Sequence, residues 1–278
     1  MIIIGFCGCT DNTTRDKNKI YVNVNGSAHY KSIQSAVENA SANKTIFVEA
    51  GVYYEHIVIN KSVNLVGEDP EKTIIDGNES GSAIKLINTG RCNITGFTIQ
   101  NSGLSKSGIE IDSSENVIED NIFQSNYDGI YANNADDNII QNNTFYSHKR
   151  YGIYLSGSDN CNIVKNQFIN NSYGLRIKAR HNLVMQNQFF DNDKGLYFCC
   201  YAEQNMVYEN DFINNTDWNA KENSHGQTWY NESMNKGNYW DDYTGNDSDG
   251  DGIGDSPYNI TSDGSKQDLY PLINPIQN

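Results

Sequence analysis

Apolar and polar residues alternate along most of this chain in short stretches that are separated by asparagine and glycine. The segment Gly152-Ile153-Tyr154-Leu155 is one example, and the same order of residue types returns every 21 to 26 residues. A two-residue period is typical of β-strands, and Asn and Gly favour turns because they tolerate positive φ. A repeat length in the low twenties predicts that one small unit of short strands is stacked many times.

Phenylalanine marks the phase of this repeat, with asparagine two residues before it and a glycine-aliphatic pair after it. The phenylalanines are Phe97, Phe123, Phe145, Phe168, Phe189 and Phe212. The asparagines are Asn121, Asn143, Asn166, Asn187 and Asn210, with a second series, Asn126, Asn171, Asn192 and Asn215, that His148 interrupts. Three short strands per turn predict an all-β fold, a single-stranded right-handed parallel β-helix. We expect the six phenylalanines to form one inward column and the asparagines to form hydrogen-bonded ladders.

The two ends of the chain depart from the repeat and predict caps. Residues 32–42 place apolar side chains on one helical face behind Ser32, a good N-cap, so we expect a helix over the open end of the β-helix. The repeat dissolves after Asn215, where tryptophans appear. The predicted organisation is an export-signal remnant and tether (1–19), the β-helix (20–236) and a C-terminal cap (237–278).

Charge and the first residues favour an extracellular or cell-surface protein. The formal net charge of −15 argues against nucleic acid and anionic membranes as partners. The start MIIIGFCGCT looks like the tail of an export signal, and Cys9 is a candidate lipid attachment site within a partial lipobox; the alternative is a disordered apolar start. Asn-x-Ser/Thr sequons recur from Asn12 to Asn259 and favour an exported glycoprotein. No stretch is long enough to span a bilayer.

An aspartate-rich loop near the C-terminus predicts a calcium site. Carboxylates at positions 1, 3 and 5 followed by glycine are typical of loops that wrap Ca²⁺. The predicted ligands are Asp247, Asp249, Asp251, the Ile253 carbonyl and Asp255. Position 12 is Tyr258 instead of glutamate, so the missing ligand must come from elsewhere, with Asp241, Asp242, Asp263 and Asp268 as candidates. The alternative is a solvated acidic turn.

The residues two after each repeat glycine predict a binding face. They should point outward and stack from turn to turn: Glu110, Tyr131, Tyr154, Arg176 and Tyr197, with Lys178 beside them. Aromatic rings at this spacing can stack on sugars, while Arg and Lys can bind hydroxyl or uronate groups. The alternative is ordinary β-propensity, since Tyr favours exposed strand positions.

The segment from Ser32 to Gly77, the repeats and the tail GNYWDDYTGNDSDGDGIGD together carry a family resemblance. The chain resembles archaeal surface proteins of the NosD-like group with carbohydrate-binding and sugar-hydrolysis repeats, and it looks like a pectin-lyase-like β-helix. The resemblance implies the fold far more strongly than an activity. The opening segment is also similar to pectin methylesterases, whose paired aspartates and arginine have no counterparts at matching positions here.

Three functions remain open at this point. The leading hypothesis is an exported protein that binds, and as a further step cleaves or remodels, a cell-envelope polysaccharide; an enzyme would be a polysaccharide lyase or a glycoside hydrolase, and its catalytic residues are unknown. The second is a structural or adhesion module held by calcium. The third is copper handling, which would need grouped Met, His or Cys, whereas the histidines are dispersed. Cys199 and Cys200 are adjacent and could bind a soft metal.

Overall fold

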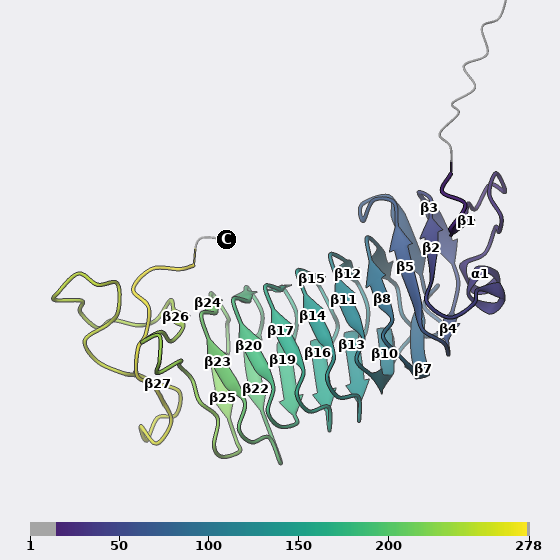
Figure 1. Cartoon of the computed structure of the whole chain (residues 1–278). Coiled ribbons are helices and arrows are strands. Elements are labelled where there is room, and N and C mark those ends of the chain that lie inside the picture. Colours follow the sequence, from purple (N-terminus) through teal and green to yellow (C-terminus); the bar gives the residue numbers. More distant parts are fainter. Residues whose placement is uncertain (1–14, 277–278) are drawn as a thin grey trace, which may run out of the picture.

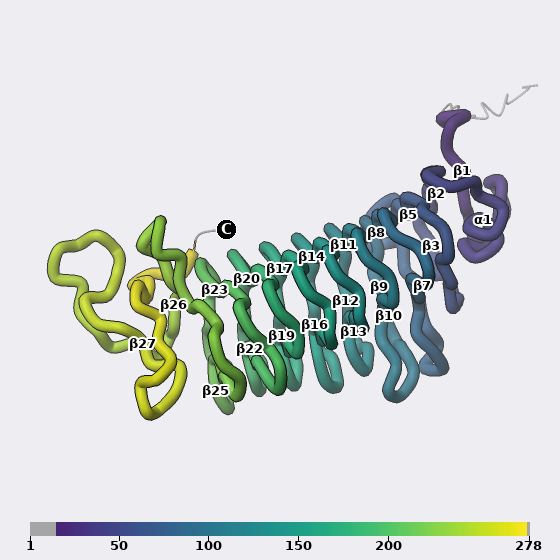
Figure 2. The backbone as a smooth tube through the Cα atoms, turned by 60° about the horizontal axis from the view of Figure 1, so that its bottom comes forward, coloured from purple at the N-terminus to yellow at the C-terminus, as the bar shows by residue number. Residues whose placement is uncertain are grey.

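Three parallel sheets run the length of the molecule and together form one long coil (Figure 1). The computed structural model describes residues 15–276. Successive turns of the chain stack beside one another along the coil, as Figure 2 shows, in about nine turns. The predicted right-handed parallel β-helix is therefore confirmed.

The strands of each sheet follow in the order of their hydrogen-bonded neighbours. Sheet A contains β1 (Lys19–Val22), β2 (Lys44–Val48), β5 (Val63–Gly67), β8 (Asn93–Thr95), β11 (Val117–Glu119), β14 (Ile139–Gln141), β17 (Asn162–Val164), β20 (Leu183–Met185) and β23 (Met206–Tyr208). Sheet B contains β3 (Gly51–Tyr54), β6 (Thr73–Asp76), β9 (Thr98–Gln100), β12 (Ile122–Gln124), β15 (Thr144–Tyr146), β18 (Gln167–Ile169), β21 (Gln188–Phe190), β24 (Asp211–Ile213) and β26 (Tyr239–Trp240). Sheet C contains β4 (Ile57–Ile59), β7 (Ile84–Gly90), β10 (Ser107–Ser114), β13 (Asp128–Asn133), β16 (Tyr151–Ser156), β19 (Tyr173–Lys178), β22 (Lys194–Phe198) and β25 (Trp218–Glu222). A separate antiparallel pair joins β27 (Tyr258–Asn259) and β28 (Gln267–Asp268).

The inward aromatic column forms, but Phe97 does not belong to it. The rings from Phe123 to Phe212 stack with centroids 4.7–5.1 Å apart, and Trp240 continues the stack at 4.4 Å. Phe123 pairs in register with Ile99, so the prediction for Phe97 was wrong by two residues. Because inward positions recur every two residues, Phe97 is still fully buried.

The predicted asparagine ladders also form. Each Asn side chain of the first series donates to the Oδ1 of the next turn, for example from Asn143 to Asn166 at 3.1 Å. The ladder continues to Asn238, and β26 pairs with β24. The stacked turns therefore extend beyond residue 236, the predicted end of the β-helix. In the second ladder, His148 takes the place of an asparagine, since its Nδ1 accepts the backbone N–H of Asn126. A third ladder, which the sequence analysis missed, includes Asn116, Asn138, Asn182 and Asn205.

The repeat glycine is required by the closeness of the stacked turns. A Cβ at Gly152 would lie 2.5 Å from the carbonyl oxygen of Gly174 and 2.7 Å from the ring of Phe168. Any side chain there would push apart two turns and displace the aromatic column. This explains why Gly and Phe recur in a fixed phase.

Both ends of the coil are covered. The helix α1 (Ile33–Asn39) is capped by Ser32, whose side chain accepts the N–H of Ser35, and buries Ile33, Ala36 and Val37 against the first turns. The predicted cap helix is confirmed. At the other end, Tyr258 stacks on Trp240 at 4.2 Å. Within residues 15–276, no helix is long and apolar enough to cross a membrane. Cys9 lies outside the described residues.

Candidate functional site

The predicted outward residues form one column on sheet C. Strand register pairs Glu110 with Tyr131, Tyr131 with Tyr154, Tyr154 with Arg176, and Arg176 with Tyr197. A parallel column on the same strands contains Tyr151, Tyr173, Lys194 and Trp218. We call these two columns the sheet C face; it lies on the strands β10 to β25 in Figure 1.

Arg176 is the centre of this face. Its guanidinium carbon lies 4.8 Å from the ring centroid of Tyr154, 5.4 Å from that of Tyr151 and 5.7 Å from that of Tyr197. The guanidinium donates to the Tyr151 hydroxyl and contacts the Cys199 Sγ at 3.4 Å. Burial opposes the charged form, but the contacts with Cys199 and Tyr151 outweigh it and raise the pKa of Arg176. Arg176 is therefore a permanent cation whose hydrogen-bond partners are uncharged.

A second cation, Arg150, comes from a turn and was missed by the sequence analysis. Its guanidinium forms an ion pair with Asp128, with Nε 2.9 Å from Oδ1, and lies 4.6 Å from the ring centroid of Tyr151. Its hydrogen bond with Asp128 raises the pKa of Arg150. Arg150 covers Asp128 and leaves this carboxylate buried. Nothing in the repeat pattern marks a turn residue that folds back over a strand.

Trp218 completes the aromatic end of the face. Its ring lies 6.0 Å from Tyr173 and 5.8 Å from Tyr197, measured between centroids. Beside them, Lys194 Nζ lies 4.9 Å from the Tyr173 ring centroid and pairs with Asp217 at 2.8 Å. Counting one more repeat after Lys194 would have found Trp218, because β25 pairs with β22 in register.

Glu110 lies at the acidic end of the face and is held by a neighbouring cation. Its Oε2 is 2.8 Å from Lys85 Nζ, and its Oε1 accepts the Ser82 hydroxyl at 2.6 Å. Although burial opposes ionisation, the bonds from Lys85 and Ser82 lower the pKa of Glu110. Glu110 and Asp128 are thus both neutralised by ion pairs. Two opposed free carboxylates, which glycoside hydrolysis requires, do not arise from this pair.

Lys178 lies at the end of β19 and lines an open polar cavity of about 370 Å³. The cavity also contains Arg180 and the exposed ring of Tyr201. Ser156 pairs with Lys178 in register, so the cavity adjoins the sheet C face directly. The combination of cations, an aromatic ring and amide side chains gives an open polar hollow that suits a polar ligand group.

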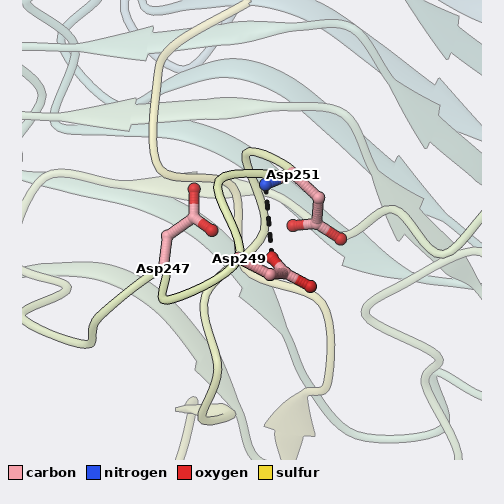
Figure 3. Close-up of side chains that lie close together, drawn as sticks. All are labelled: Asp247, Asp249 and Asp251. Atoms are coloured by element: carbon pink, nitrogen blue, oxygen red, sulfur yellow. Dashed lines mark hydrogen bonds between the residues drawn. The ribbon is translucent and has the colours of Figure 1, made fainter.

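The aspartate loop brings three of its five predicted ligands together. Oxygens of Asp247, Asp249 and Asp251 lie within 4.8 Å of one another. Figure 3 shows these three side chains side by side on the loop. The Asp247 carboxylate accepts the N–H groups of Gly250 and Gly252, which folds the loop tightly. Asp255 instead accepts hydrogen bonds from Ser248, and the N–H of Ile253 donates to Asp251.

The four aspartates that are candidates for the missing calcium ligand already accept hydrogen bonds from other groups. Asp268 is buried and accepts from the Asn238 N–H at 2.7 Å and from Trp240 Nε1 at 3.0 Å, and burial raises its pKa to about 6. Asp241 binds Asn214 and Asn219, Asp242 binds Asn219 and Tyr258, and Asp263 binds Thr261 and Ser265. Asp268 therefore anchors the C-terminal cap and is not available to the loop.

The cysteines separate into buried and exposed thiols. Cys92, Cys161 and Cys199 are buried, whereas Cys200 is exposed. Burial raises the pKa of Cys161 to about 12, and burial also raises the pKa of Cys199. Protonated, buried thiols are poor metal ligands, so Cys199 acts here as a neighbour of Arg176.

Comparisons with known proteins agree with the fold. Residues 37–245 match the family model described as "Periplasmic copper-binding protein (NosD)". A "Probable ABC transporter binding protein NosD" from Pseudomonas aeruginosa is 36% identical over 77 residues, covering 28% of this chain and 18% of that protein. A "Probable pectinesterase/pectinesterase inhibitor 6" from Arabidopsis thaliana is 40% identical over 80 residues, covering 25% of this chain and 14% of that protein. The matches thus span less than a fifth of either relative.

A comparison with solved structures also shows the fold. Pectin methylesterase from carrot superposes with a TM-score of 0.50 at 12% identity, covering 78% of this chain and 84% of that chain. At this identity the likeness shows a common fold and leaves the activity open.

Proposed function

This chain belongs to the NosD family, and we propose that it is an exported β-helix protein whose sheet C face binds an acidic polysaccharide. The observation that carries the proposal is Arg176, a cation held among the rings of Tyr151, Tyr154 and Tyr197 with no carboxylate among its hydrogen-bond partners. Guanidinium groups bind carboxylates in a bidentate manner, and tyrosine rings stack on the apolar faces of sugars.

The charge of the molecule supports an acidic ligand. The chain carries a net charge of −15, yet Arg176, Lys178, Arg180 and Lys194 gather on or beside one face. Lys194 pairs with Asp217 and Arg180 with Glu203, whereas Arg176 bonds uncharged groups. A cation such as Arg176 on an acidic protein attracts anionic ligands to one place while the rest of the surface repels them. The local similarity to a protein named as a pectinesterase also supports a sugar polymer.

Binding to immobilised acidic and neutral polysaccharides tests the proposal. Tyr154→Ala and Arg176→Ala should each weaken binding to the acidic polymer about tenfold, since each removes roughly 1.4 kcal/mol of contact. Tyr146→Ala on sheet B and Arg91→Ala, both exposed side chains away from the face, are matched controls and should bind normally. Unchanged binding by both test variants would exclude the sheet C face as the site.

In the part of the chain that the structure describes, the His and Cys side chains do not gather into a group that fits copper, which the family description names. Copper favours His, Met and Cys ligands, but His56 is bonded to Ser80 and Ser82, and His148 is buried in the ladder. Burial lowers the pKa of His148 to about 3. Among residues 15–276, the one group of at least three close His, Cys, Asp or Glu side chains is the aspartate trio, whose oxygens suit hard cations.

We also propose that the aspartate loop binds Ca²⁺ and stabilises the C-terminal cap. The convergence of Asp247, Asp249 and Asp251 supports this assignment. The neighbouring backbone carbonyls and water would complete the coordination.

A further inference from the structure

A serine and a histidine on the first turns form a hydrogen-bonded pair outside the sheet C face. The Ser80 Oγ lies 3.0 Å from His56 Nε2, and His56 Nδ1 lies 2.9 Å from the backbone carbonyl oxygen of Ser82. Because a carbonyl can only accept, Nδ1 carries the proton and Nε2 is left as an acceptor for the Ser80 hydroxyl. The same hydroxyl is 3.3 Å from the Gly77 carbonyl, so its shorter contact is with the imidazole.

The backbone holds both side chains in place. His56 immediately precedes β4, and Ser80 lies in the loop 77–83 between β6 and β7. Asn78 and Glu79 both have positive φ, at 48° and 53°, and the Asp76 carboxylate accepts the N–H of Asn78. The loop is therefore bent sharply at a defined point, just before the serine.

A glycine makes room for the imidazole. A Cβ at Gly81 would lie 2.9 Å from both Cε1 and Nδ1 of the His56 ring. The ring can approach the loop, and so reach Ser80, only because residue 81 lacks a side chain. Both Ser80 and His56 are exposed, so a substrate can reach the pair from solvent.

We propose that Ser80 and His56 hydrolyse a carboxylic ester, with Ser80 as the nucleophile and His56 as its general base. A nucleophile within hydrogen-bonding distance of a base that a third group orients is the arrangement that such catalysis requires. The Ser80 oxygen attacks the ester carbonyl carbon while its proton passes to His56 Nε2. The alcohol then leaves with that proton, and water, activated by the same nitrogen, releases the acid from Ser80.

The Ser82 carbonyl, the group that orients His56, favours esters over amides as substrates. The backbone carbonyl of Ser82 fixes the tautomer of His56, but a neutral dipole stabilises the imidazolium less than a carboxylate would. The arrangement therefore suits substrates with a good leaving group, and an ester of a sugar hydroxyl meets that need better than a peptide.

The pair adjoins the sheet C face through Ser82. The Ser82 carbonyl binds His56, and the Ser82 hydroxyl donates to Glu110, the first residue of the face. An acyl ester on a polysaccharide that lies along the face would thus reach Ser80. The assignment to a sugar ester rests on the proposed function, whereas the reactivity of the pair does not.

Labelling with a fluorophosphonate probe and hydrolysis of p-nitrophenyl acetate test the pair without any polysaccharide. The wild type should be labelled at Ser80, as mapped by peptide mass spectrometry, and Ser80→Ala should abolish the labelling. His56→Gln should slow labelling and hydrolysis about 100-fold or more. Gly81→Ala should also slow both, because it displaces the ring of His56. Ser105→Ala and His225→Gln, exposed residues outside the pair, are controls and should react like the wild type.

The outcomes separate this proposal from the binding proposal. Absence of labelling at Ser80, or full hydrolysis by Ser80→Ala, overturns the pair whatever the sheet C face binds. Release of acetate from an acetylated acidic polysaccharide should need both Ser80 and Arg176. If Arg176→Ala lowers that release while p-nitrophenyl acetate is still hydrolysed normally, the substrate assignment holds. If wild type hydrolyses p-nitrophenyl acetate but releases no acetate from the polysaccharide, the sugar ester is excluded and the reactive pair stands. If Arg176→Ala changes neither reaction, the sheet C face does not present the ester to Ser80.

Discussion

The inner column on sheet B and the outer face of sheet C come from the same stacked turns, yet their side chains repeat in opposite ways. Inside, each turn repeats the residue of the last, as in the stack from Phe123 to Trp240. Outside, the residue type varies along the column, from Glu110 through two tyrosines to Arg176. Identical side chains on neighbouring turns give a uniform core with fixed spacing. Differing side chains on neighbouring turns give a surface that combines charged and aromatic groups. Stability should therefore depend on the inside and binding on the outside.

The largest expected effect comes from emptying the inner column. Phe168→Ala should lower the free energy of unfolding by about 3–5 kcal/mol, because it leaves a cavity between Phe145 and Phe189. Tyr154→Ala on the outside should cost about 1 kcal/mol or less. Urea unfolding of both variants measures the difference. Equal losses would contradict the division between inside and outside.

The pH dependence of stability should reveal the buried carboxyl at the end of the ladder. Burial raises the pKa of Asp268 to about 6, well above the usual range of an aspartate, so the native state holds this proton more tightly than the unfolded state. The contribution of Asp268 to stability is thus fully present below about pH 4 and is lost as the pH rises through 6, by about 2–3 kcal/mol.

Urea unfolding at a series of pH values isolates the contribution of Asp268 to the free energy of unfolding. The wild type is compared with Asp268→Asn. Other carboxyl groups, such as Glu110 with its lowered pKa, act in the opposite direction and are common to both proteins. The difference in unfolding free energy between the two proteins should change between pH 4 and 6 and stay constant above 7. A constant difference throughout would refute the linkage.

Calcium should have a smaller effect, confined to the outside of the cap. At a free concentration about ten times the Kd, Ca²⁺ bound to the native loop should add roughly 1.4 kcal/mol and raise the Tm. Calorimetry with Ca²⁺ and with a chelator measures this shift. Asp249→Asn should remove most of it, while Asp263→Asn, outside the trio, should keep it. If calcium does not change the Tm of the wild type, the loop is a solvated acidic turn and does not bind calcium.

The sequence was sufficient to predict the fold because its constant residues have steric and hydrogen-bonding roles that only stacked turns satisfy. It failed at Phe97 because a strand alternates every two residues, so a two-residue slip leaves the side chain inward and the pattern unchanged. The interval of 26 residues before Phe123 signals an insertion but does not locate it.

The sequence predicts the residues of the sheet C face only on the strands, where the repeat length gives the position of each outward side chain. Tyr154 and Arg176 lie where the repeat places them. Arg150 and the pair of Ser80 and His56 come from turns, whose paths depend on local backbone bends such as those at Asn78 and Glu79. Such bends leave no periodic trace in the sequence.

The asparagine ladder also gives the coil an electrical direction. Every carboxamide from Asn121 to Asn238 donates toward the C-terminal end, so their dipoles add along the axis as peptide dipoles do in a helix. The positive pole meets the Asp268 carboxylate, which accepts the last amide. A further turn can extend this array only in the same orientation. Lengthening by duplication of a turn therefore preserves the polarity, and a hydrogen-bond acceptor for the last amide is needed wherever the array stops.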